Sequence, residues 1–233
     1  MAYNLFFYFL LFIIYSIAGW LLEVTAVGIE KRKFINRGFL IGPYCPIYGF
    51  SAVIMILLLH NYQDDPFVLF IMAAFVCTFF EYITSVFMEK LFKARWWDYS
   101  HRAFNINGRV CLQNSAIFGI LGCLLIMFIN PFVEKLLHTM PDWLLIYISS
   151  ILLVGFVADY IISFNIISKF KSTANTVIKD NTEEISEKIR EILQKRSVLS
   201  RRLVNAFPDV KAILPDIKAK YEKGKKKLKE KLR

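Results

Sequence analysis

Acidic and guanidinium side chains stand inside or beside long apolar segments, and their chemistry suits the binding of a charged ligand. Glu23 and Glu81 lie within apolar runs, whereas Arg37, Asp98 and Arg109 stand where polar connections meet such runs. An ionisable residue in a membrane-spanning helix is costly and usually faces a partner or a water-filled cavity. These residue types predict a polar site for an anionic or lipid-linked ligand.

Glu81 is the most isolated of these carboxylates, because aromatic residues flank it on both sides. Burial disfavours the charged form, so Glu81 either carries a proton or pairs with a cation. By topology, Arg37 and Arg109 are the nearest candidate partners. The alternative is a structural tie between helices, since a buried ion pair does not by itself indicate a ligand site.

A second polar group precedes the apolar run that starts near residue 110. Asn107 and Gly108 signal a turn, and Asn114 lies where the next helix is expected to open. Free N–H groups and the positive end of the helix dipole favour an anion there, and Arg109 adds positive charge. Ordinary capping of the helix by polar side chains is the competing interpretation.

The stretch 37–49 is apolar after its first residue, yet it contains three glycines and two prolines. Pro43 and Pro46 each remove a backbone N–H and clash with the preceding helical turn. Inside a bilayer, irregular backbone survives only where protein or water satisfies the freed polar groups. A broken apolar segment of this kind therefore indicates a binding site.

Composition places these residues in a membrane protein, because 56% of the 233 residues are hydrophobic. A spanning helix needs about 20 apolar residues. The sequence predicts an all-α, polytopic helical bundle of about five spans, at 5–29, 39–60, 67–90, 110–130 and 143–168.

Charge divides the chain into a transmembrane helical domain, 1–168, and a basic, helical cytosolic tail, 169–233. The first part holds ten Lys/Arg and ten Asp/Glu, whereas the tail holds nineteen and nine. Positive connections stay in the cytosol. This rule predicts a multi-pass protein of the cell membrane with its N-terminus outside, its tail inside and the polar residues towards the cytosol.

Two features of the tail suggest interactions of its own. Apolar residues between 185 and 206 follow a heptad pattern, which predicts a coiled coil. The segment 218–233 is strongly basic, and such a segment gains about 1 kcal/mol per Lys or Arg near anionic lipid. Nucleic-acid binding is not predicted, because no aromatic platform accompanies the charge. A merely solvated tail is the alternative.

Three blocks of the chain resemble the bacterial membrane proteins of the ABC-transporter type IV, or CmpB-like, permease family and follow one another in the same order. They are Gly19-Trp-Leu-Leu-Glu23, the stretch 37–49, and a block from Glu81 through Trp97-Asp-Tyr-Ser and Asn107-Gly-Arg-Val-Cys-Leu to Gly119. The resemblance covers roughly 3–168 and implies a role in transport. It assigns no residue a role.

The absence of a phosphate-binding loop limits the transport hypothesis, because no G-x-x-x-x-G-K-[ST] motif occurs. A permease would need a separate ATPase subunit, and five spans favour a homo-oligomer. No cofactor or metal is predicted. Two other functions remain open. The chain could be a membrane enzyme that acts on lipid headgroups through these acidic and basic residues, or a scaffold that acts through its tail.

Overall fold

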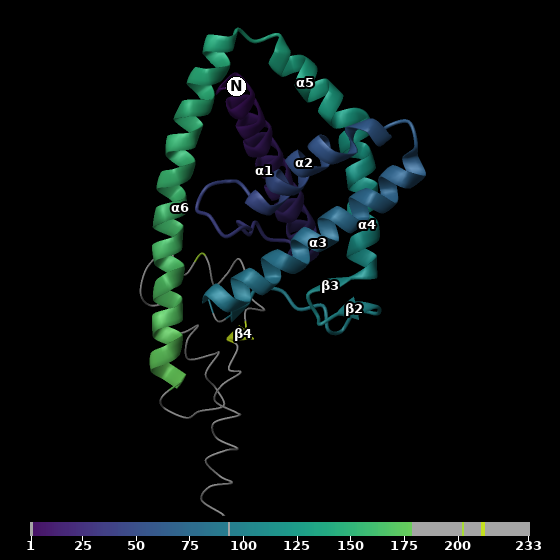
Figure 1. The fold of residues 1–233 in the computed structure, drawn as a ribbon. Helices are drawn as coiled ribbons and strands as arrows, with labels where there is room; N and C mark the ends of the chain where they lie inside the picture. The colour runs from purple at the N-terminus through teal and green to yellow at the C-terminus, as the bar shows by residue number, and fades with distance from the viewer. Residues whose placement is uncertain (1, 93, 179–201, 203–210, 213–233) are drawn as a thin grey trace, which may run out of the picture.

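The computed structural model is a bundle of helices (Figure 1) and describes residues 2–92, 94–178, 202 and 211–212. The predicted all-α membrane-bundle class is confirmed, with only two small pairs of strands added. The elements in chain order are α1 (Ala2–Lys31), α2 (Pro46–Leu59), η1 (His60–Tyr62), α3 (Pro66–Phe92), β1 (Ala94–Arg95), β2 (Asn105–Ile106), β3 (Val110–Cys111), α4 (Leu112–Leu124), η2 (Leu125–Ile129), α5 (Asn130–His138), α6 (Asp142–Ile178) and β4 (Lys211–Ala212).

In the described part of the chain, four helices are long and apolar enough to cross a membrane. They are Tyr3–Lys31, Pro66–Leu91, Leu112–His138 and Asp142–Asn165. The second predicted span, 39–60, forms instead a shorter apolar helix over Pro46–Tyr62.

The shortening of this second helix has a local cause. The backbone is not helical from residue 34 to residue 45, and α2 starts with Pro46 in its first turn. A proline there loses nothing, because the first N–H groups of a helix have no partner within it. The predicted break in the stretch 37–49 is thus confirmed.

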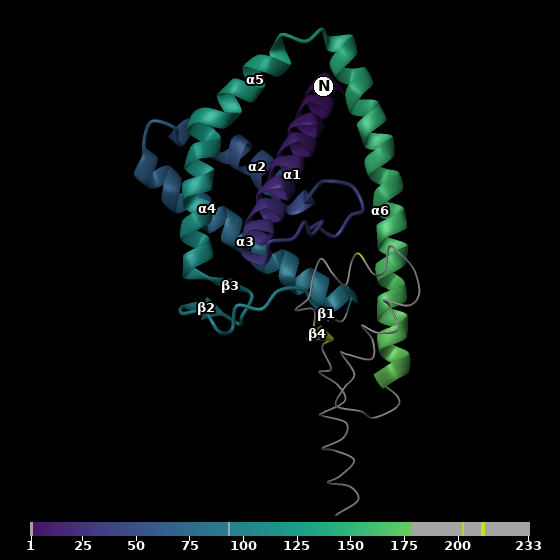
Figure 2. The ribbon, with the colours of Figure 1, turned by 180° about the vertical axis from the view of Figure 1, so that it is seen from behind.

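α1 and α6 run away from the end of the bundle that carries the N-terminus, whereas α4 and α5 together run back towards it (Figures 1 and 2). The start of α1 and the end of α6 consequently lie at opposite ends of the bundle. The side of the membrane on which each end lies stays a prediction.

Small residues bring the helices close together in the core. A Cβ added to Gly49 on α2 would lie 2.4 Å from the carbonyl oxygen of Phe12 on α1. Between α4 and α3, a Cβ added to Gly122 would lie 2.4 Å from the Cβ of Ala73. Such residues allow close backbone approach, which drives helix association in membranes.

The fourth predicted span, 110–130, is too short, because the helix continues to His138. The predicted end at residue 130 stands just before Pro131, and a proline breaks a regular helix. In the structure, the segment Leu125–Ile129 just before this proline is π-helical. A π-helical turn already departs from the regular hydrogen-bond pattern, so the proline is accommodated there.

The predicted boundary at residue 168 falls inside α6, which continues to Ile178. The predicted coiled coil at 185–206, apart from Arg202, and the basic segment 218–233 lie outside the described residues. Within the tail, β4 pairs antiparallel with β1. The division into two domains stays a prediction.

Candidate functional site: two polar networks beside a non-helical loop

The loop 32–45 is held in place by one carboxylate of α6. Asp159 accepts hydrogen bonds from the backbone N–H groups of Ile41, at 3.0 Å, and Gly42, at 2.7 Å. Its second oxygen also accepts a hydrogen bond from the Tyr44 hydroxyl, at 2.6 Å. Backbone N–H groups that lie outside any helix therefore find their acceptor on α6, more than a hundred residues away in the sequence.

The same loop is also tied to α1. The backbone N–H of Cys45 donates to the Ser16 carbonyl oxygen at 2.9 Å, and the Trp20 indole N–H donates to Asn36 at 2.7 Å. Burial raises the pKa of Cys45 to about 12, and the Glu23 carboxylate adds to this effect. Cys45 is thus a neutral thiol, which does not suit a nucleophile.

Two of the predicted site residues, Glu23 and Arg37, meet where α1 passes into this loop. The Arg37 Nε lies 3.4 Å from the Glu23 Oε2, with side chains 21% and 32% exposed. The Tyr48 hydroxyl donates to the other Glu23 oxygen at 2.7 Å. A separate pair, Glu81 and Tyr99, interacts with Glu23 only electrostatically, and these five residues together are called here the first network.

Glu81 lies on α3, is only 7% exposed, and accepts one hydrogen bond, from the Tyr99 hydroxyl at 3.3 Å. Its other oxygen, Oε2, has no hydrogen-bond partner within the described part of the chain. The alternative in which Glu81 pairs with Arg37 or Arg109 is not found among the described residues, because these arginines contact other carboxylates there. Arg109 contacts Glu89, which lies about 12 Å further along α3 towards the loop that carries this arginine.

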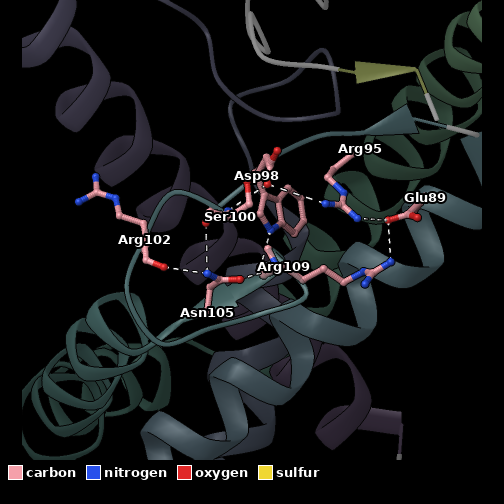
Figure 3. A network of polar contacts seen from close by, with 9 residues as sticks. Glu89, Arg95, Asp98, Ser100, Arg102, Asn105 and Arg109 are labelled. Carbon is pink, nitrogen blue, oxygen red and sulfur yellow. Dashed lines mark hydrogen bonds and ion pairs between the residues drawn. The ribbon is translucent and has the colours of Figure 1, made fainter. Parts of the chain in front are cut away.

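The second network, called here the loop network, consists of Glu89, Arg95, Asp98 and Arg109 (Figure 3). One oxygen of Glu89 lies 2.8 Å from Arg109 and 3.4 Å from Arg95. Arg95 also lies 3.8 Å from Asp98. Two guanidinium groups thus share a single carboxylate oxygen at the end of α3.

A tight turn between β2 and β3 shapes this network, as the sequence predicted. Asn107 and Gly108 have φ values of 53° and 67°, which asparagine and glycine adopt most easily. A Cβ on Gly108 would lie 2.8 Å from an oxygen of Asp98. The Asn107 amide donates to the Tyr82 hydroxyl, and the Arg109 guanidinium lies over the Tyr82 ring.

At the start of α4, few polar groups of the described residues are free to form the anion site that the sequence suggested. Asn114 is half-buried, and its side chain makes no hydrogen bond to the residues that the structure describes. Its neighbours are occupied, because Gln113 accepts a hydrogen bond from Arg102 and Ser115 accepts one from Thr78. An anion site at this helix end stays a prediction.

The seven predicted site residues therefore divide into two groups, with Asn114 in neither. The first group is Glu23, Arg37 and Glu81, and the second is Asp98, Asn107 and Arg109. The two tyrosines of the first network were not among the predicted site residues, although a hydroxyl in an apolar segment needs a partner. Burial raises the pKa of Tyr99 above its usual range, with the carboxylates of Glu81 and Glu23 adding to the effect. Tyr99 is accordingly a neutral hydrogen-bond donor to Glu81.

The two networks lie within the part of the chain that matches a known family. The family model named "Putative ABC-transporter type IV" matches residues 10–164. No curated protein and no solved structure matches the chain.

Proposed function

This chain belongs to the ABC-transporter type IV family, and we propose that it is the membrane subunit of an ABC-type transporter that binds an anionic or lipid-linked ligand at the loop network. Family membership and the four long apolar helices support a membrane protein related to transport. The ligand and its binding residues are our proposal. A separate ATPase subunit would supply the energy, and a second copy of this chain would enlarge the path.

The arrangement of Arg95 and Arg109 carries the proposal. Both contact the same oxygen of Glu89, and the Nε atom of each is buried without a hydrogen-bond partner among the described residues. A guanidinium group offers several donors in one plane and suits the paired oxygens of a phosphate or carboxylate. An anion that reaches these side chains would use donors that Glu89 leaves free.

The position of the network also supports a ligand that arrives from the headgroup region. The side chains of Arg95 and Arg109 are 24% and 15% exposed, so they are partly screened from solvent but not enclosed. Beside them, the segment 101–104 is exposed and contains Arg102. Partial burial strengthens a charge-assisted hydrogen bond relative to one in bulk water.

Lipid retention tests the proposal. Wild-type protein and the Arg109→Gln variant are purified in detergent, mixed with equal amounts of phosphatidylglycerol and phosphatidylcholine, and examined by native mass spectrometry. We expect the wild type to retain phosphatidylglycerol in preference and the variant to lose most of that preference. Lys33→Gln is the matched control, because Lys33 is an exposed cation outside the network.

Equal preference in the wild type and in Arg109→Gln would contradict the proposed binding site. Inorganic phosphate added as a competitor distinguishes a headgroup site from a site for a free anion. Chemical change of the bound lipid without movement across a vesicle membrane would favour the membrane enzyme over the transporter.

A further inference from the structure

Among the described residues, Glu81 is the carboxylate of the first network that has no cation as a partner. Only 7% of this residue is exposed, and its Oε2 atom has no hydrogen-bond partner in the part of the chain that the structure describes. Its only polar contact, from the Tyr99 hydroxyl to Oε1, is long at 3.3 Å. A buried charge with so few donors is unfavourable.

The neighbouring charges do not compensate. Glu23 interacts electrostatically with Glu81 but is already paired with Arg37. The other titratable groups that interact with Glu81 are the Cys77 thiol, on the same helix, and the Tyr99 phenol, on the loop. None of these groups is a cation, and no ion pair to Glu81 occurs among the described residues.

The charge count indicates what must occupy the site. Glu23 and Arg37 cancel, so an ionised Glu81 would leave one net negative charge in the buried network. A bound metal ion would need several further ligands, but the described residues contain no group of three or more His, Cys, Asp or Glu side chains able to hold one. A proton on Oε2 removes the charge and needs no further ligand.

We propose that Glu81 is a proton-binding site of the membrane domain, neutral at pH 7, and that Tyr99 couples its protonation to the loop network. Tyr99 donates to Glu81 through its hydroxyl, while its backbone N–H donates to the Gly108 carbonyl oxygen at 2.7 Å. Gly108 in turn lies beside Asp98 of the loop network. Movement of this loop would therefore withdraw or return the hydrogen bond that Glu81 receives.

The consequence is an exchange of one proton when the loop moves. A Tyr99 hydroxyl held close stabilises the ionised carboxylate, because hydrogen bonds to the charged form favour it. When the hydroxyl moves away, the neutral acid is favoured and Glu81 takes up a proton. This site is independent of whether the loop network binds an anion, so failure of the lipid-retention experiment would leave it standing.

Infrared spectroscopy of the full-length protein in lipid nanodiscs tests the proposal. The protonated carboxylic acid has a C=O stretching band that shifts in heavy water and that an ionised carboxylate lacks. We expect this band at pH 7 in the wild type, its loss at higher pH, and its absence from Glu81→Gln at pH 7. Glu30→Gln, which changes an exposed carboxylate at the end of α1, should leave the band unchanged.

Tyr99→Phe provides a second readout that a purely structural role would not change. Loss of the hydroxyl should move the titration of the band to higher pH, because the ionised carboxylate loses its only donor. Sodium at constant pH should have no effect on the band. If Glu81→Gln does not fold, the wild type and Tyr99→Phe still decide the question.

Three outcomes would overturn the proposal. The first is a wild-type protein without the band at pH 7, and the second is a band that persists in folded Glu81→Gln. The third is a band that sodium abolishes, which would show that a metal cation is the occupant.

Discussion

The carboxylate of Asp159 accepts a hydrogen bond from the backbone N–H of Gly42 at 2.7 Å, although 117 positions separate the two residues. This contact joins α6 to the long non-helical connection between α1 and α2. It explains how an irregular backbone survives among apolar helices, because its polar groups are satisfied by protein. The position of the loop, and hence of Arg37, depends on it.

Replacement of Asp159 by alanine should loosen this loop. The change removes a charged acceptor with several donors, and hydrogen bonds to charged groups contribute about 1.5–3 kcal/mol each. We expect a loss of about 2–4 kcal/mol in unfolding free energy in detergent, with faster proteolysis within 32–45. Asp142→Asn, an exposed residue at the start of the same helix, should change neither. Unaltered proteolysis of Asp159→Ala would contradict the anchoring role.

Replacement of Gly108 by alanine should disrupt the loop network. The residue has a φ of 67°, and its added Cβ would lie 2.8 Å from Asp98. The backbone conformation alone costs about 1 kcal/mol or more for a residue with a side chain. Thermal unfolding should show a lower Tm. Gly155→Ala is the control, since a Cβ there meets nothing within 4 Å. If the Tm of Gly108→Ala were as high as that of the wild type, the steric argument would be refuted.

Replacement of Tyr15 by phenylalanine should weaken the contact between α1 and α5. The Tyr15 hydroxyl donates to the Asn130 side chain at 2.8 Å, and both residues are buried. Removing one partner of a buried hydrogen bond costs about 1–3 kcal/mol. Unfolding in detergent measures the loss, and Tyr147→Phe, which alters a residue 62% exposed, should have no effect. A similar change in both variants would remove the special role of Tyr15.

The reactivity of Cys45 should depend on pH in an unusual way. Its pKa is raised to about 12, and only the thiolate reacts. In a variant whose other three cysteines are serine, labelling by a maleimide should be slow at pH 7 and rise about tenfold per pH unit up to pH 10, without a plateau.

A second cysteine placed at exposed Ser100 is the control for this experiment and should label at an ordinary rate. If the labelling rate of Cys45 instead reached a plateau near the ordinary thiol pKa of about 8.5, the burial argument would be contradicted. Adding Asp159→Ala should speed the labelling of Cys45, because the same loop carries both the thiol and the backbone groups that Asp159 holds.

Local properties of the chain were sufficient for much of the fold. Long apolar runs predicted the four long helices, prolines predicted the break before α2, and Asn107-Gly108 predicted the turn between β2 and β3. Each follows from residues that are neighbours in sequence. The predicted end of the fourth span at residue 130 is wrong, because the helix continues through a π-helical segment and past Pro131 to His138.

By itself, therefore, the sequence determined the helical membrane class, the position of the broken segment and the set of charged residues in and beside the apolar segments. Only the tertiary structure decided the pairing: Arg109 contacts Glu89, whereas Glu81 receives its hydrogen bond from a tyrosine. The reason is physical. Helical spacing fixes which residues share a face, but the rotation and depth of each helix, set by packing across the whole bundle, decide which carboxylate a guanidinium group reaches.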